Sequence, residues 1–409
     1  MSITKEKNIL DNFSKTIPAS LTGPDRVNYI LENIDKLSGD DKISLRNLFN
    51  KFLTGMIERD ASDIEVGGHA NAASIWMRIY GKKKRVEDLP QFSLDEAAVL
   101  IINLLNSNQR KYLALTRNLD FSYTYLYERR NLNVRFRADA YFDLDTLALN
   151  MRAINQTIRP LKSLDFHPNV VKMMSHGYIK FGLSLVTGIT GSGKSTTLDA
   201  FIDYHNNFDP CHIIIVASPI EYVHISKISI IRHREVGRDV LTFKDGVIQA
   251  LRQDPDIIVI GEMRDPDTIL AALEVTDTGH KVFSTLHTSS ATESIDRIIA
   301  EVHPNEQERV RNRLADVLVT VVSQKLIPSL DGKRIMAKEV LIATPSVKAA
   351  IKNNNTSEIY MMINQGGNMG MITMEQDLKR LYLEKKISLE NAVAYANNKT
   401  RIQQLLTAA

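Results

Sequence analysis

The sequence contains one cysteine, Cys211, among 409 residues. A single thiol excludes a disulfide within the chain and a C-x-x-C zinc site, because each of these needs at least two cysteines. We therefore expect a protein without zinc that is compatible with a reducing compartment. Cys211 stands just before an apolar, strand-like segment, where we expect a partly buried and unreactive thiol.

Long hydrophobic runs are also missing. No apolar stretch approaches the roughly 18 residues of a membrane-spanning helix, and the first residues do not resemble a secretory signal peptide. We expect a cytoplasmic protein, peripheral at the inner face of the cell membrane if it works there. The charge is nearly balanced, with 51 basic and 48 acidic residues and a net charge of +3. This small excess gives no reason to expect direct binding of nucleic acid.

One dense basic run, Lys82–Arg85, follows Gly81. It lies between two strand-like stretches, so we interpret it as a solvated hairpin turn rather than a ligand-binding patch.

The most informative segment is GITGSGKS, which matches the phosphate-binding pattern G-x-x-x-x-G-K-[ST]. An apolar run of strand length precedes it and a helix-forming stretch follows, which is the context that the pattern requires. Backbone N–H groups and the helix dipole would hold a polyphosphate there. We expect Lys194 to reach the β- and γ-phosphates of ATP, and the Ser195 hydroxyl to bind Mg²⁺. The predicted nucleotide-binding residues are Gly188, Ile189, Thr190, Gly191, Ser192, Gly193, Lys194, Ser195 and Thr196.

The chain is long enough for two or three domains. Short apolar runs alternate with helical stretches in its second half, which predicts an α/β domain with a parallel sheet covered on both faces. These runs are Leu183–Thr187, Ile213–Ala217, Ile257–Ile260 and Val282–Leu286. We expect a helical extension over residues 1–50, a mixed domain over 51–160, a linker over 161–170, the nucleotide-binding domain over 171–345 and a helical region over 346–409.

Polar residues follow two of the apolar runs, where a parallel sheet binds its ligands. Glu262 follows Ile257–Ile260 and would orient or deprotonate the attacking water; the alternative is an acid in the first turn of a helix. It is also a candidate for the metal site. His287 follows the last run, where it would sense the terminal phosphate or serve only as a structural residue.

Two arginines far from the loop in sequence are further candidates. Arg135 and Arg137 share one face of a predicted strand, with Arg152 as a weaker third. Such residues are usually solvated or paired with carboxylates. If a neighbouring region or subunit brought them to the triphosphate, they would stabilise its developing charge.

Taken together, the motifs resemble the type II/IV secretion ATPase superfamily of RecA-like hexamers, and within it the PilT-type pilus-retraction ATPases. The resemblance runs from about residue 60 to the C-terminus. It rests on ASD at 61–63, RFR at 135–137, the phosphate loop, REVGR at 234–238, LRQDPD at 251–256, GEMRD at 261–265, TGH at 278–280, STLHT at 284–288 and GMITM at 370–374.

The resemblance implies a PAS-like α+β N-terminal domain, a RecA-like domain and a homo-hexameric ring. It makes Glu262 the Walker-B glutamate, places His287 in the histidine box and gives Arg135 and Arg137 a role near the nucleotide. A membrane platform protein of a pilus or secretion machine is the implied partner. The family's Asp box, usually EDPIE, here reads Ala217-Ser218-Pro-Ile-Glu221, so an acid is missing.

We therefore expect a ring-forming ATPase that drives type IV pilus retraction. Two alternatives stay open: an ATPase of a type IV-like secretion or conjugation apparatus, and a weakly hydrolysing, nucleotide-gated structural subunit.

Overall fold

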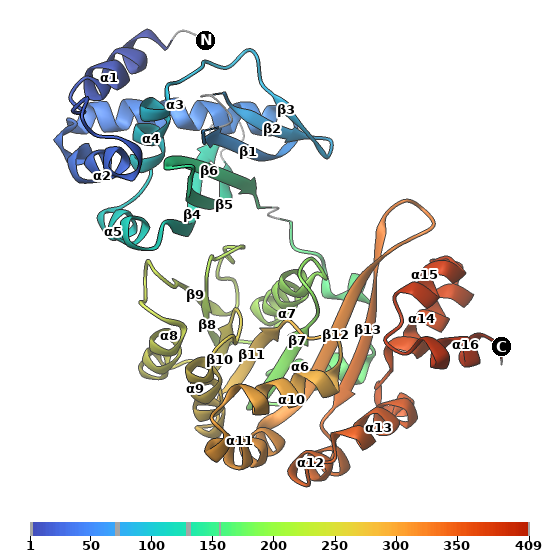
Figure 1. Ribbon diagram of the computed structural model, residues 1–409. Helices are drawn as coiled ribbons and strands as arrows, with labels where there is room; N and C mark the ends of the chain where they lie inside the picture. Colours follow the sequence, from blue (N-terminus) through green and yellow to red (C-terminus); the bar gives the residue numbers. More distant parts are fainter. Residues whose placement is uncertain (1–2, 70–73, 128–131, 155–156, 408–409) are drawn as a thin grey trace. The chain divides into compact units, whose positions relative to one another are not determined.

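Apolar side chains gather into separate cores on either side of residue 156. The computed structural model describes residues 3–69, 74–127, 132–154 and 157–407. They belong to two units, Met1–Gln156 and Thr157–Ala409. Each unit is described by itself below (Figure 1).

The N-terminal unit is an α+β domain built on a six-stranded sheet in the order β3-β2-β1-β6-β5-β4. Every neighbouring pair in this sheet is antiparallel. Its strands are β1 (Ala61–Gly67), β2 (Trp76–Ile79), β3 (Lys82–Arg85), β4 (Asn118–Tyr127), β5 (Leu132–Asp143) and β6 (Thr146–Ala153). Its helices are α1 (Thr4–Ser14), α2 (Gly23–Asn33), η1 (Ile34–Lys36), α3 (Gly39–Glu58), α4 (Leu94–Ile102) and α5 (Ser107–Thr116).

The expected boundary at residue 50 does not separate two structures. Helix α3 runs through it, and Phe49 and Phe52 are fully buried in one core with strand residues such as Phe136. Residues 1–50 are helical, but they are not a separate extension. Their apolar faces pack into the same core as the sheet. An amphipathic helix gains most of its stability from such packing.

The basic run is a strand and not a turn. The turn is made by Tyr80 and Gly81, which both have positive φ, and Lys82–Arg85 forms the edge strand β3. All four side chains are exposed, and Lys83 pairs with Glu65 of β1. The alternation predicted around Arg135 is confirmed, because Val134, Phe136 and Ala138 are buried.

The C-terminal unit is an α/β domain with a seven-stranded sheet in the order β13-β12-β7-β11-β10-β8-β9. All pairs are parallel except β12–β13. The strands are β7 (Gly182–Thr187), β8 (His212–Ala217), β9 (Ile230–Glu235), β10 (Ile257–Ile260), β11 (Lys281–Leu286), β12 (Leu318–Pro328) and β13 (Arg334–Ile342).

Helices cover this sheet and continue beyond it to the C-terminus (Figure 1). They are η3 (Leu161–Leu164), α6 (Pro168–Met174), α7 (Lys194–Phe208), α8 (Phe243–Ala250), η4 (Leu251–Gln253), α9 (Pro266–Asp277), α10 (Ala291–Glu301), α11 (Pro304–Val317), α12 (Pro345–Lys352), η5 (Thr356–Glu358), α13 (Ile359–Gln365), η6 (Gly367–Met369), α14 (Met374–Leu383), α15 (Leu389–Ala394) and α16 (Lys399–Thr407). Within the described residues, none of them has the length and apolar character needed to cross a bilayer.

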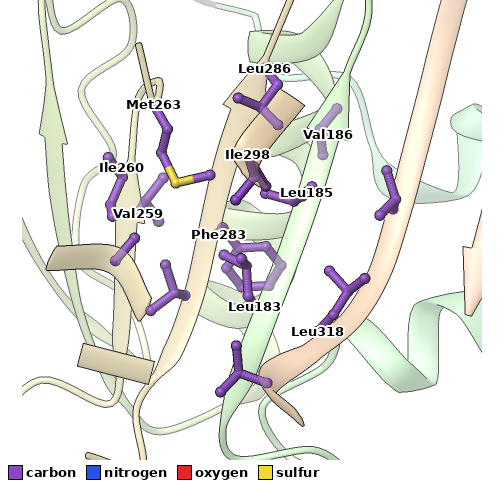
Figure 2. Packing of buried hydrophobic residues seen from close by; sticks show 14 of the residues in the cluster. Leu183, Leu185, Val186, Val259, Ile260, Met263, Phe283, Leu286, Ile298 and Leu318 are labelled. Carbon is purple, nitrogen blue, oxygen red and sulfur yellow. The ribbon is translucent and has the colours of Figure 1, made fainter. Parts of the chain in front are cut away.

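The four predicted apolar runs form the central strands β7, β8, β10 and β11. Their side chains are buried on both faces, and Figure 2 shows Leu185, Val259 and Phe283 packed with Ile298 of α10. A parallel strand covered by helices on both faces has no solvated side, which is why these runs read as continuous apolar segments.

The expected linker over 161–170 is partly structured. It contains η3 and the start of α6, and Leu164 and Val170 are buried. The region 346–409 is helical as expected. Its helices α12 and α13 contribute to the core of the sheet domain, whereas α14–α16 pack with Ile327 and Ala337 of the β12–β13 hairpin in a smaller cluster.

Lys281, at the start of β11, is fully buried. Its Nζ donates to the carbonyl oxygens of Met173 (3.2 Å) and Ile179 (3.0 Å) and lies 5.6 Å from the centre of the Phe283 ring. Burial lowers its pKa to about 7, with Asp209 acting in the opposite direction. An ammonium group is costly to bury, so the neutral amine is favoured.

This environment predicts a stability that rises with pH. Between about pH 7 and 10 the unfolded chain holds a proton on Lys281 that the folded chain has lost, so the free energy of unfolding increases by about 1 kcal/mol per pH unit. Lys281→Met removes this contribution. We expect the free energy of unfolding, measured with urea, to rise less between pH 7.5 and pH 9 for the variant than for wild type. Lys180→Met, at an exposed lysine, is the control; equal gains for all three proteins contradict the prediction.

Candidate functional site

The phosphate-binding loop lies between the end of β7 and the start of α7, as the sequence predicts. Gly188, Gly191 and Gly193 have φ values of 148°, 80° and 90°. These positive values favour glycine, and a Cβ on Gly188 would collide with the Gln324 carbonyl oxygen and the Ser192 hydroxyl. The backbone therefore has the conformation that turns N–H groups toward an anion.

Helix α7 begins at Lys194, and no side chain caps its N-terminus. Its first N–H groups and its dipole are therefore directed at the loop, which suits a phosphate group. Ile189, Thr190 and Ser195 are exposed around the loop, and Thr196 is half-buried. The contacts of these residues with a nucleotide stay a prediction.

Lys194 is held over the loop. Its Nζ donates to the carbonyl oxygens of Gly188 (2.8 Å) and Ile189 (3.2 Å). Burial lowers its pKa, while the carboxylates of Glu262 and Glu221 act in the opposite direction. Both acids therefore lie within electrostatic range of the lysine.

Glu262 follows β10 and is mostly buried. Its Oε2 lies 2.6 Å from Arg264 Nε and 3.7 Å from His287 Nε2. It is not in the first turn of α9, because Asp265 caps that helix. The structural alternative for Glu262 is thereby excluded, and the residue belongs to a cluster with Lys194 and His287.

His287 follows β11 and contacts this cluster from the other side. Its Nδ1 lies 3.5 Å from Thr190 Oγ1 of the loop. Burial lowers the pKa of His287, as do Lys194, Arg264 and Arg297, whereas Glu262 raises it. The neutral imidazole is thus favoured near neutral pH, where it can donate one hydrogen bond and accept another.

The arginine candidates belong to the other unit. Arg135 and Arg137 lie on β5; Arg137 is half-exposed, with Nη2 3.6 Å from Asp120 Oδ2. Arg152 of β6 is engaged by Asp63, with Nε 2.8 Å from Oδ1. Their approach to the nucleotide therefore stays a prediction.

The degenerate Asp box follows β8, next to the strand that carries Glu262. Gly261 N donates to Val216 O at 2.8 Å, and a Cβ on Gly261 would lie 2.9 Å from the Ala217 Cβ. Ala217 and Gly261 thus allow two strand ends to approach closely. Neither position carries an acid, so Glu221 is the acid that this segment contributes near Lys194.

Gln324 of β12 is a site residue that the sequence analysis missed. Its side chain is buried; Nε2 donates to Ser192 O at 2.8 Å and Oε1 accepts from Thr197 Oγ1 at 2.9 Å. It therefore ties the loop to the first turn of α7. The signal was present in the sequence, because Ser323 and Gln324 interrupt an otherwise apolar strand.

Among the described residues, no group of three or more His, Cys, Asp or Glu side chains is arranged to hold a metal ion. A site for Mg²⁺ at Ser195 and Glu262 would therefore depend on phosphate oxygens for most of its ligands, which is usual for this ion. Cys211 is buried, and burial raises its pKa to about 11, in agreement with an unreactive thiol.

Comparisons with known proteins identify the family. A family model described as "Type II/IV secretion system protein" matches residues 38–407. The twitching motility protein of Neisseria gonorrhoeae is 39% identical over 323 residues, which cover 79% of this chain and 84% of that protein. The type IV pilus retraction ATPase PilT of Pseudomonas aeruginosa is 40% identical over 316 residues, covering 77% and 89%.

Solved structures show the same relationship. The crystal structure of the pilus retraction motor PilT with bound ADP has a TM-score of 0.77 and 35% identity, and the match covers 87% of this chain and 98% of that one. The Legionella pneumophila ATPase DotB has a TM-score of 0.66 and 25% identity, covering 89% and 96%. The fold is therefore that of a RecA-like P-loop domain with an N-terminal α+β domain.

The contact of Gln324 with the loop predicts a nucleotide-affinity defect. Gln324→Leu leaves Ser192 O and Thr197 Oγ1 without a buried partner, at a cost of about 1–3 kcal/mol. We expect at least about tenfold weaker binding of a fluorescent ATP analogue. In the variant the free loop is less ordered, so the free-energy cost of ordering it reduces the affinity for the nucleotide. Thr320→Val removes a buried hydroxyl of the same strand away from the loop and should bind normally. Equal affinities for the two variants contradict the role of Gln324.

Proposed function

The chain belongs to the Type II/IV secretion system protein family, and we propose that it is a ring-forming ATPase that drives type IV pilus retraction. The observation that carries this proposal is the cluster at the strand ends: a glycine-rich loop with Lys194 over it, and Glu262 within electrostatic range of that lysine. The similarity to the retraction ATPase PilT over most of both chains supports retraction, rather than assembly, as the output.

The reaction is hydrolysis of the γ-phosphate of ATP by an in-line water molecule. Lys194 and the N–H groups of the loop stabilise the negative charge that the phosphates carry in the transition state. Glu262 accepts a hydrogen bond from the water and orients it, while its pairing with Arg264 fixes the carboxylate. His287 would respond to the terminal phosphate, a role that its contacts with Thr190 and Glu262 support.

A bound Mg²⁺ would neutralise part of the phosphate charge. Ser195 would contribute a hydroxyl ligand to this ion, and the Glu262 carboxylate would help to hold it. Arg135 and Arg137 would complete the charge compensation, which can contribute about 10³-fold or more in rate.

We propose a homo-hexamer that works at the cytoplasmic face of the membrane against a platform protein of the pilus. In this arrangement, closure around ATP moves the units and opening follows product release. The family description supports a second output, an ATPase of a type IV-like secretion or conjugation apparatus with the same chemistry. The absence of acids at Ala217 and Ser218 supports a third, a subunit that binds ATP but hydrolyses it weakly.

The active-site assignment predicts loss of turnover in two variants. Lys194→Ala removes the cation that contacts the phosphates, and Glu262→Gln removes the carboxylate that orients water. We expect steady-state ATPase activity to fall at least about 10²-fold in each. Only Lys194→Ala should also weaken ATP binding strongly. Three equal rates for wild type and the two variants would show that the assignment is wrong.

The Asp box provides a test between the motor and the weakly hydrolysing subunit. Because the Glu221 carboxylate already acts electrostatically on Lys194, we expect Ala217→Glu with Ser218→Asp to change ATPase turnover less than about tenfold. A gain of about 10² or more, the size of an acid–base contribution, favours the weakly hydrolysing subunit instead. Activity measured alongside oligomeric mass, with and without ATP, separates a rate effect from a change in assembly.

A further inference from the structure

The chain between β8 and β9, residues 218–229, forms neither helix nor strand. It begins beside Gly261 and Glu262, since β8 and β10 are neighbours in the sheet and Val216 is paired with Ile260. It also carries Glu221, whose carboxylate raises the pKa of Lys194 against the effect of burial. Something other than a hydrogen-bond ladder must therefore hold this loop in place.

Helix α7 supplies that support through a polar stripe. The stripe consists of Asp199, Asp203, Asn206 and Asn207; Asp203 is four residues after Asp199 and three or four before the two asparagines, which places them on one side of the helix. Asn206 Nδ2 donates to Ile225 O (2.8 Å), and Asn206 Oδ1 accepts from Lys227 N (2.9 Å). The same helix carries Lys194 and Ser195 at its N-terminus, so one element supports both parts of the site.

The backbone N–H of Ile220, next to Glu221, donates to Glu235 Oε2 of β9 at 3.4 Å. Among the contacts between α7 and the loop, the one closest in sequence to both Lys194 and Glu221 joins Asp199 and His224. Asp199 is five residues after Lys194 and His224 is three after Glu221. His224 Nε2 lies 3.0 Å from Asp199 Oδ1, and the imidazole is almost fully buried. A buried ring held by a carboxylate fixes the backbone that bears it more firmly than an exposed pair can.

Neighbouring rings restrict His224 further. Its ring lies edge-on to Tyr222 with centroids 4.6 Å apart and stacks on His233 at 6.1 Å. Its backbone N–H donates to His233 Nε2 at 3.0 Å. By contrast, the next contact along the stripe pairs Asp203 with Lys227, whose side chain is 49% exposed.

We propose that the Asp199–His224 contact positions Glu221 for ATP hydrolysis. The proposal rests on the ATPase function proposed above and gives Asp199 and His224 a positioning role. In this arrangement the contact ties the segment that bears Glu221 to the helix that bears Lys194. Positions 217 and 218 carry no acid, and Glu221 is the acid that remains in this segment. By holding Glu221 in position, the contact compensates for the missing acids.

The test is an ATPase double-mutant cycle between Asp199→Ala and Glu221→Gln. We expect Asp199→Ala to lower kcat about tenfold, because a small displacement of a catalytic group can cost as much or more. Affinity for a fluorescent ATP analogue should stay within about twofold of wild type. In the Glu221→Gln background the same substitution should have little further effect, because the two residues act as one unit.

Two matched variants separate positioning from folding. Asp203→Ala cuts the exposed contact on the same stripe and should keep the wild-type kcat. Asp199→Asn retains an oxygen that accepts from His224 and should recover most of the activity. If Asp199→Ala does not fold, His224→Asn tests the contact from its other side.

Three results overturn the proposal: a kcat for Asp199→Ala equal to that of Asp203→Ala, effects of Asp199→Ala and Glu221→Gln that add in full, or a wild-type rate for Glu221→Gln. Each is distinct from failure of the proposed function, which requires that Lys194→Ala and Glu262→Gln leave the rate unchanged.

Discussion

The nucleotide site depends on the close approach of the phosphate-binding loop to strand β12. Gly188 has no side chain, so the loop can lie against the backbone of Gln324, and the Gln324 side chain then joins Ser192 to Thr197. Thr187, the last residue of β7, is also hydrogen-bonded to Ser323, at 2.7 Å. The loop is therefore fixed from a strand that enters the sheet more than a hundred residues later. Because the loop is already ordered, less conformational entropy is lost when a phosphate binds.

Much of the C-terminal unit could be predicted from the sequence because its signals are local. A buried parallel strand reads as an apolar run, and the four runs that the sequence offers form β7, β8, β10 and β11. The hairpin β12–β13 was not predicted. Its polar residues lie in the middle of β12, and only the folded sheet shows that Gln324 faces the loop.

The N-terminal unit was harder to predict because its core joins distant segments. Residues 1–50 have an amphipathic pattern of their own, and nothing local shows that their apolar faces pack against strands that come later. Likewise, the composition of Lys82–Arg85 suggested a turn, whereas pairing with β2 makes it an edge strand. Exposed lysines at such an edge oppose further strand addition, so the charge has a structural reason.

The β12–β13 hairpin has a mechanical consequence. Gln324 contacts the loop, and Ile327, three residues later on the same strand, lies in the cluster formed with α14–α16. Three residues of strand span about 10 Å. A hydrogen-bonded pair of strands resists bending and acts as a short, stiff lever. The position of the phosphate-binding loop and that of the terminal helices are therefore both tied to this one pair of strands.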